Sequence, residues 1–453
     1  MILHLLCRRK TRVVLTAVLA AFSAGVVDAR QADPASTYRR MSGNVRVTQN
    51  GQVLLTADIT LDRTQTVYLQ SDGRFYPSHG RTQAAMYLTV DGRLTGNHSL
   101  IDWTVASTES PVQHSFNCIG LTTLPAGNHR VRLVARRFDR DFSVGSESNL
   151  CVLVSPAARA AANNGGRVRD IDVFTDNETR IDRLPTFTAA SLRAPAGGNA
   201  VIALASGRCR TRNLRGPWGD AKYAIGLNGN MVSRAEQAMS VQDLFKGAEQ
   251  EAPMFTHARF SANRISGDPT IELLATEFPW PVPPNIPQNL VFDSRWPYLV
   301  ALCGPFGCNG HASTSRAGRE YDFTDYLTVG GNQPNTPPLN QWNRIARGTI
   351  RIPTGHNGIV MVTGKARFQG DRRDAGGHGA LRLRIDGRYV GSIGVQGLSN
   401  GHAVSQRTVG ASFLTSGGAA LSVGDHTVEL MGRAAGDFRH LSVHREANLL
   451  WFD

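Results

Sequence analysis

AMYLTVDGR, at residues 85–93, is repeated as KYAIGLNGN at 222–230 and as ALRLRIDGR at 380–388. In each copy apolar residues occupy every second position, and the copy reaches Asp-Gly or Asn-Gly before its last residue. A period of two is typical of a strand with one buried face, and the Asx-Gly pair favours the positive φ values of a tight hairpin turn. Each copy therefore predicts a strand, a two-residue turn and a second strand.

Two further phrases follow each copy in the same order. The second phrase alternates apolar residues with charges that we expect to face water, such as Glu272 and Glu429, and the third is a short apolar strand. They read GNHRVRLVA (127–135), GDPTIELLA (267–275) and GDHTVELMG (424–432), and then NLCVLV (149–154), YLVALC (298–303) and NLLWFD (448–453). Repetition of a whole unit predicts three copies of one fold, and many short strands with Gly-containing turns fit a β-sandwich. We predict an all-β protein of three tandem jelly-roll-like sandwiches.

Composition suggests where the units begin and end. We expect sandwiches at residues 41–155, 168–303 and 345–453, with a Gly/Asn/Pro-rich linker at 304–344 and a small polar linker near 155–169. Within the second unit, residues 233–250 favour a short helical insertion. Insertions on a repeated scaffold usually lie in loops that carry function, so the second unit is the better candidate for binding.

The order of a long alternating strand, a G-[ND]-x-x-[VI]-x-L hairpin and a terminal apolar strand resembles secreted jelly-roll modules of the C1q and tumour-necrosis-factor-like kind. It is also similar to carbohydrate-binding jelly rolls. The resemblance implies a jelly-roll fold. It includes no diagnostic residue set, so no binding residue is carried over from either family, and a fold alone does not give a function.

Residues 1–29 match a secretory signal peptide. A basic stretch at 8–12 precedes an apolar stretch at 13–27 and a small-residue cleavage pattern at 27–29. A membrane anchor is the alternative, but the apolar run is shorter than the roughly 20 residues that span a bilayer. We expect cleavage after Ala29, no transmembrane segment, and a mature chain that is secreted, periplasmic or on the cell surface.

Export to an oxidising compartment allows disulfides to persist. Cys118 and Cys151 both lie on strand-like segments of the first unit, and a bridge that closes such a loop contributes about 3–4 kcal/mol. We predict this disulfide. Cys303 can join either Cys209 or Cys308, and the sequence leaves that choice open.

The chain is basic, and almost all of its positive charge is arginine. The net charge of +13 falls to about +10 when four basic residues and Asp28 leave with the signal. A biased genome composition explains this preference, and so does an anionic partner such as an acidic polysaccharide, which guanidinium groups bind bidentately. Arginines gather in or beside two strand segments, where the alternative is a solvated strand face: Arg130, Arg132, Arg136 and Arg137, and Arg382, Arg384 and Arg388. No motif predicts sequence-specific binding of nucleic acid.

No common catalytic motif is present: there is no G-x-S-x-G elbow, H-E-x-x-H, P-loop or dinucleotide-binding fingerprint. His440, His444 and Glu446 share one face of a possible strand, where they could form a metal site or an acid–base pair, or simply meet solvent. Cys303, Cys308 and His311 match no standard zinc spacing. We predict no catalytic residue, no metal and no cofactor.

We therefore expect an exported bacterial protein that acts by binding or assembly. In the first hypothesis it is a structural or adhesive component that contacts itself or another surface component, because the terminal strand 449–452 is apolar on both faces and needs cover from a subunit or another unit. In the second it binds anionic or neutral polysaccharide, with Trp218, Trp280 and Trp296 as a stacking site unless they are core residues. A secreted hydrolase is a third possibility.

Overall fold

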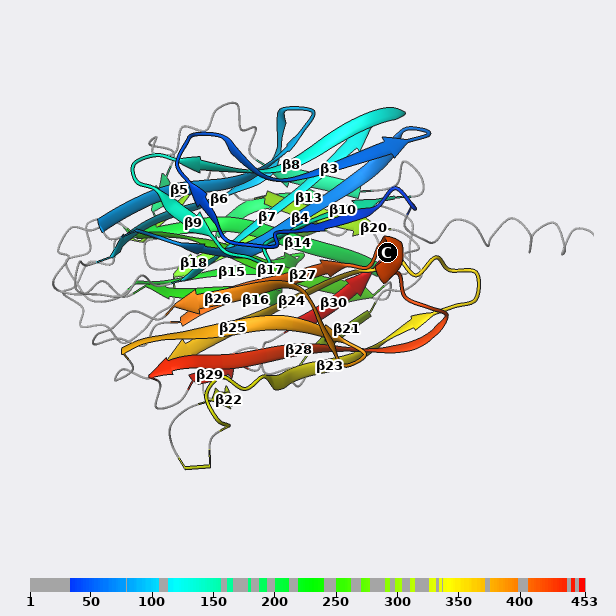
Figure 1. Cartoon of the computed structure of the whole chain (residues 1–453). Coiled ribbons are helices and arrows are strands. Elements are labelled where there is room, and N and C mark those ends of the chain that lie inside the picture. Colours follow the sequence, from blue (N-terminus) through cyan, green and yellow to red (C-terminus); the bar gives the residue numbers. More distant parts are fainter. Residues whose placement is uncertain are drawn as a thin grey trace, which may run out of the picture.

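The computed structural model is built almost entirely of β-strands (Figure 1). It describes residues 33–78, 80–105, 113–155, 161–165, 178–180, 187–193, 200–211, 219–239, 250–261, 270–277, 290–293, 298–303, 310–313, 326–330, 334–335, 337–370, 375–397, 406–437, 441–444 and 448–452. The signal-peptide prediction lies outside these residues. Within them the structure contains one short 3-10 helix, η3 (Gly417–Ala419).

The first unit is a sandwich of two antiparallel sheets. Its strands are β1 (Thr37–Arg40), β2 (Val45–Val47), β3 (Gln52–Leu61), β4 (Gln65–Tyr76), β5 (Gly80–Val90), β6 (Arg93–Val105), β7 (His114–Leu124), β8 (Gly127–Arg137), β9 (Phe142–Val144) and β10 (Asn149–Val154). One sheet runs β1-β10-β4-β7, with β9 beside β4 and β2 beside β9, and the other runs β3-β8-β5-β6. Apolar side chains from both sheets, among them Leu69, Met86 and Leu133, fill the space between them.

The other two units repeat this topology strand for strand. Unit 2 contains β11 (Ala161–Gly165), β12 (Glu178–Arg180), β13 (Phe187–Arg193), β14 (Ala200–Thr211), β15 (Gly219–Leu227), β16 (Asn230–Met239), β17 (Gln250–Ser261), β18 (Thr270–Glu277), β19 (Leu290–Asp293) and β20 (Tyr298–Cys303). Unit 3 contains β21 (Gly310–Ser313), β22 (Tyr326–Gly330), β23 (Asn343–Ile352), β24 (Met361–Gly370), β25 (Ala375–Ile385), β26 (Arg388–Gly397), β27 (Gln406–Leu414), β28 (Gly424–Asp437), β29 (Leu441–His444) and β30 (Asn448–Phe452). The pairs β3–β8, β4–β7, β5–β6 and β4–β10 correspond to β13–β18, β14–β17, β15–β16 and β14–β20, and to β23–β28, β24–β27, β25–β26 and β24–β30. The three repeated phrases therefore occupy equivalent strands, as predicted.

The repeated Asx-Gly pairs form the predicted hairpin turns. Asp91, Asn228 and Asp386 have φ angles of 50°, 50° and 47°, and the glycine that follows each is also at positive φ. Each Asx side chain also accepts a backbone N–H from the neighbouring strand, as Asp91 does from Arg130 at 2.8 Å. This bond fixes the position of the strand that the second phrase forms.

Two expectations about the segments between the repeats are wrong. Residues 233–239, predicted to start a helical insertion, belong to strand β16; positions 240–249 lie outside the described residues. The expected linkers supply strands: β11 pairs with β20, and β21 and β22 pair with β30 and β29. Each unit therefore starts earlier than composition suggested, because its first two short strands carry too few residues to show a period.

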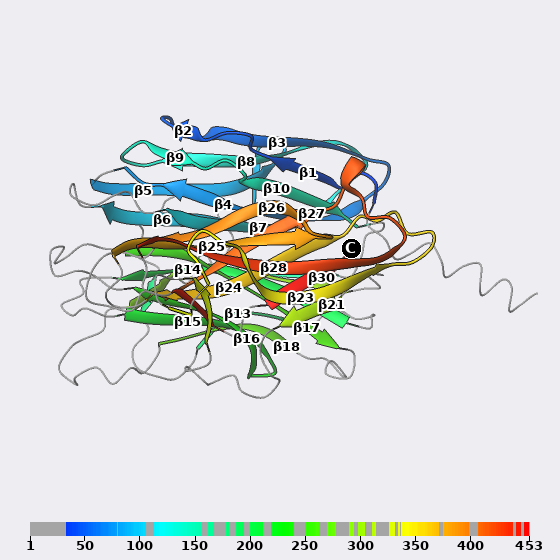
Figure 2. The ribbon, with the colours of Figure 1, turned by 60° about the horizontal axis from the view of Figure 1, so that its bottom comes forward.

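The three units close on one another in a ring. Strand β6 of unit 1 contacts β14 and β17 of unit 2, and β16 of unit 2 contacts β27 of unit 3. Strand β26 of unit 3 contacts β4 and β7 of unit 1, beside which it lies in Figure 2. One apolar cluster draws residues from all three units: Tyr68, Ile119, Leu121, Cys151, Leu153, Ile202, Leu204, Phe255, Leu302, Ile359, Met361, Leu414, Leu450 and Phe452. We call this the central cluster.

The ring explains the apolar terminal strand. Trp451 packs in the core of unit 3, whereas Leu450 and Phe452 on its other face lie in the central cluster. Both faces of β30 are thus covered within one chain. The sequence argument for self-association, which needed an uncovered face on this strand, loses its premise.

The predicted Cys118–Cys151 disulfide is absent, and both thiols are free and buried. Cys118 on β7 pairs with Ser71 of β4, and Cys151 on β10 pairs with Gln70 on the other side of that strand. Two strand spacings, about 10 Å, separate their backbones, which exceeds the reach of a disulfide. Because adjacent residues of β4 face opposite ways, Cys118 points into the core of unit 1 and Cys151 into the central cluster.

We expect neither Cys118 nor Cys151 to react with iodoacetamide in the native protein. Burial raises the pKa of both thiols, and only the thiolate is nucleophilic. Peptide mapping should find both residues alkylated after unfolding without reductant. Recovery of a peptide that links Cys118 to Cys151 from the purified protein would contradict the structure.

Candidate functional site

The outer face of the sheet β23-β28-β25-β26 carries arginines at the border with unit 1. In β25, Leu381 and Leu383 are buried in the core, so Arg382 and Arg384 between them point outward. Arg433 joins them from the neighbouring strand β28. Arg382 and Arg384 thus lie on the face of β25 opposite the core of unit 3, where both side chains are partly buried.

An aromatic pair lies among these guanidinium groups. The rings of Trp342 and Tyr389 are 5.7 Å apart between centroids and inclined by 41°. Arg433 Cζ lies 4.8 Å from the centroid of Trp342, and Arg382 Cζ lies 5.4 Å from that of Tyr389. Cation–π contacts of this kind orient a guanidinium while leaving N–H groups at its edge free to donate.

Unit 1 contributes a further arginine from strand β4. Gln70, Asp72 and Arg74 occupy every second position of β4 and so share the face of this strand that points towards the other units. Arg74 lies at the rim of that interface. Its guanidinium donates to Gln113 Oε1 at 3.2 Å and to Ser146 Oγ at 3.4 Å. Gly145 leaves room for it, because a Cβ there would come within 2.5 Å of Arg74 Cγ.

One carboxylate of unit 1, that of Glu147, lies among these arginines. Glu147 Oε1 accepts from Arg382 Nη2 at 2.9 Å and lies 3.9 Å from Arg40 Nη1. Its backbone has a φ of 69°, a region that costs a non-glycine residue on the order of 1–3 kcal/mol. The bond from Glu147 N to Met41 O, 3.0 Å long, helps to hold it there. Sequence reasoning did not identify this residue.

Positive charge exceeds negative charge at this place. Arg74, Arg382 and Arg433, hereafter the arginine cluster, each have a buried Nε for which the described residues offer no acceptor. Burial lowers the pKa of Arg433, and the charges of Arg74 and Arg382 lower it further, while Glu147 opposes them. Burial also lowers the pKa of His378, with Arg433 and Arg74 acting in the same direction. The site is therefore suited to accept an anionic group.

Two other arginines of the strand segments singled out from the sequence, Arg384 and Arg130, are paired with carboxylates. Arg384 Nη2 lies 2.6 Å from Glu429, which the sequence placed in water but which is buried between Arg384 and Arg344. In unit 1, Arg130 Nε lies 2.6 Å from Asp58 Oδ1. Arg384 and Arg130 therefore differ from Arg74 and Arg433, for which the described residues show no ion pair.

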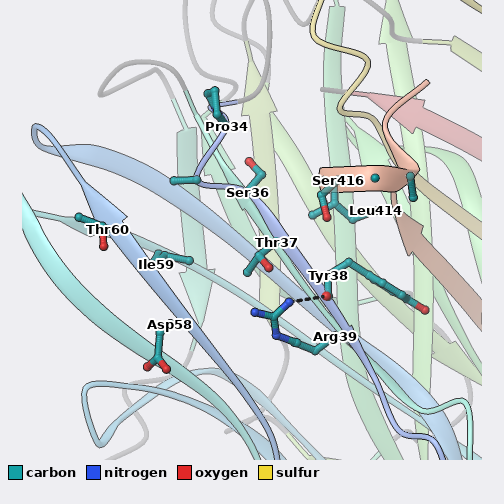
Figure 3. A pocket seen from close by; sticks show the side chains of 14 residues that line it. Pro34, Ser36, Thr37, Tyr38, Arg39, Asp58, Ile59, Thr60, Leu414 and Ser416 are labelled. Atoms are coloured by element: carbon teal, nitrogen blue, oxygen red, sulfur yellow. Dashed lines mark hydrogen bonds between the residues drawn. The ribbon is translucent and has the colours of Figure 1, made fainter. Parts of the chain in front are cut away.

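A hollow of about 570 Å³ lies between β1, β3 and the segment around η3 (Figure 3). Of its two charged residues, Asp58 is paired with Arg130, and Arg39 donates one hydrogen bond, to the backbone oxygen of Tyr38 at 3.2 Å. The remaining lining is neutral, and its polar side chains are mostly hydroxyls, such as those of Thr37, Thr60 and Ser416. The hollow thus has fewer unpaired groups to offer a ligand than the arginine cluster has.

The stacking site predicted from the sequence, Trp218, Trp280 and Trp296, lies outside the described residues, as do His440, Glu446 and Cys308. Among the residues that the structure describes, no helix is long and apolar enough to cross a membrane, and no three His, Cys, Asp or Glu side chains gather as a metal site would require. The aromatic pair that the structure does bring together had no sequence signal, since Trp342 lies just before β23 and Tyr389 lies in β26.

No protein-family model and no curated protein matches the chain. Similar solved structures include an Eiger TNF from S. frugiperda (15% identity, 28% of this chain and 96% of that one, TM-score 0.20). They also include N-glycanase F (8% identity, 57% and 95%, TM-score 0.29) and a tandem CBM22 domain from Paenibacillus barcinonensis Xyn10C (10% identity, 61% and 97%, TM-score 0.18). TNF-like and carbohydrate-binding folds are thus among the loose matches, and at such TM-scores no function is transferred from any of them.

Proposed function

We propose that this chain is an exported, non-catalytic bacterial protein that adheres to polysaccharide through the border of units 1 and 3. The observation that carries the proposal is the arginine cluster beside the Trp342–Tyr389 pair. Aromatic rings pack against the apolar faces of sugar rings, and guanidinium groups bind hydroxyl and acidic groups in fixed geometry. Together they provide both kinds of contact that a sugar polymer needs.

The closed ring supports an attachment role over that of an extended spacer. Three sandwiches joined end to end would act as a flexible rod, whereas these units share the central cluster and buried polar contacts across their borders. A rigid block holds groups from two units in register. This matters here because Arg74 comes from unit 1 and Arg433 from unit 3.

Replacement of Trp342 by alanine is expected to weaken polysaccharide binding about 10-fold or more, since an aromatic contact to a ligand contributes on the order of 1–2 kcal/mol. A glycan array followed by affinity electrophoresis in the polymer that scores highest measures the change. Val423→Ala, an exposed apolar replacement elsewhere on unit 3, is the matched control and should bind as the original protein does.

A second variant tests the site predicted from the sequence. If Trp280→Ala abolishes binding while Trp342→Ala leaves it intact, the second unit holds the sugar site and the border site is wrong. If no glycan binds the original protein at all, the proposed function fails.

A further inference from the structure

The arginine cluster has the donors that a binding site for one oxyanion needs. Its three buried Nε atoms lack an acceptor among the described residues, and a buried donor without a partner is uncommon in proteins. A carboxylate or sulfate group presents several oxygens to satisfy such donors at once. The stacking contacts from Arg382 through Tyr389 and Trp342 to Arg433 hold two of the guanidinium groups in place before anything binds.

Repulsion among these arginines favours the same occupant. Arg74 and Arg382 each act on the charge of Arg433, and the ion pairs found in the described residues give neither Arg74 nor Arg433 a carboxylate. Like charges held together in a partly buried place are stabilised by an anion that enters between them. Binding of an anion thus offsets the electrostatic repulsion among the three guanidinium groups.

Glu147 already supplies one carboxylate, but only at the edge. It binds Arg382 through Nη2 and leaves the Nε of that residue without an acceptor. Its side chain is partly exposed, and its backbone is held at positive φ. Glu147 therefore stands where an external acid would approach Arg382, in a conformation that it does not favour by itself.

We propose that Arg74, Arg382 and Arg433 bind a single oxyanion of an acidic sugar, a carboxylate or a sulfate, and that Glu147 is a built-in competitor for this position. The identification of the ligand as a sugar rests on the proposed function; the oxyanion site itself rests on the three arginines. Bound anion contacts both units and so ties unit 1 to unit 3 across their border. Displacement of Glu147 sets the affinity.

Calorimetric titration of the full mature chain with sodium sulfate, and separately with sodium glucuronate, tests the proposal at an ionic strength kept constant with chloride. We expect saturable binding of at least one probe. Arg433→Met and Arg74→Met should each weaken it about 10-fold or more, as loss of one charge-assisted hydrogen bond predicts. Arg130→Met, an exposed arginine on unit 1, is the control and should bind unchanged.

The competitor is tested by Glu147→Gln, which keeps the size of the side chain and removes its charge. This variant should bind the probe several-fold more tightly. Equal or weaker binding overturns the role of Glu147, and equal binding by Arg433→Met and Arg130→Met overturns the site. Absence of saturable binding by the original protein overturns both, whether or not any variant folds.

The two probes also separate this inference from the proposed function. Sulfate binding alone identifies a sulfate ester as the acidic group, and glucuronate binding alone identifies a carboxylate; either supports the oxyanion site. Probe binding without any polysaccharide binding leaves the site standing and removes the proposed function. Polysaccharide binding without binding of either probe leaves the proposed function standing and removes the oxyanion site.

Discussion

Phe452→Ala is expected to lower the free energy of unfolding by about 3–5 kcal/mol, as truncation of a buried phenylalanine usually does. Phe452 is fully buried in the central cluster, where its ring lies 6.0 Å from that of Tyr68 in unit 1. The replacement leaves a cavity that all three units share. Urea unfolding followed by fluorescence measures the loss.

The same unfolding experiments check that the residues packed around Phe452 belong to its own chain. The midpoint of unfolding should not depend on protein concentration, for the original protein or for Phe452→Ala, and Val423→Ala should change it little because Val423 is exposed. A midpoint that rises with concentration, together with a dimer in light scattering, would mean that separate copies supply the cover. A loss below about 1 kcal/mol would contradict the central cluster itself.

Asp72→Asn is expected to change how stability depends on pH. Asp72 is completely buried on β4, and burial raises its pKa from 3.8 to about 6, although hydrogen bonds from Ser412, Asn117 and Gln70 oppose the shift. The folded protein therefore binds a proton more tightly than the unfolded chain does. The stabilisation that protonated Asp72 provides is fully present below about pH 4. It is lost as the pH rises through about 6, by up to about 3 kcal/mol.

Asparagine cannot titrate, so the variant should lack this part of the pH dependence. The measurement is the free energy of unfolding of both proteins at pH 4 and at pH 8, where the advantage of the original protein over Asp72→Asn should be larger at pH 4. Asp62→Asn, on the exposed turn between β3 and β4, is the matched control. Parallel pH profiles for the original protein and Asp72→Asn would refute a protonated Asp72 in the fold.

The place of Asp72 shows that the three borders differ chemically. Strand pairing puts Ser206 opposite Tyr298 and Lys365 opposite Asn448. At the corresponding place in unit 1, the backbone N–H of Asp72 donates to Asn149 Oδ1 at 2.9 Å. The three positions thus hold an acid, a hydroxyl and an amine. Lys365 donates to Thr256 Oγ1 at 2.6 Å, across the border of units 2 and 3. Buried polar groups that need particular partners favour one arrangement of the units over others.

The sequence by itself determined the strands, their buried faces and their turns. Asp91-Gly92 and its two repeats reach positive φ because these residue types permit it, and Met86 and Leu88 are buried because they alternate. Such features depend on neighbours in the chain, so a short phrase is enough to predict them. The same reasoning failed where the period is too short to read, as in the first two strands of each unit.

Only the tertiary structure decided which faces meet. Cys118 and Cys151 were predicted to form a disulfide, but β4 lies between the strands that carry them. Arg382 binds Glu147, which is 235 residues away in the sequence. Contacts of this kind depend on the packing of whole sheets, because the direction of each side chain is set by strand order and the ring of units. The arginine cluster therefore has no signature in any single segment: its members are ordinary outward residues of three strands until two units close on each other.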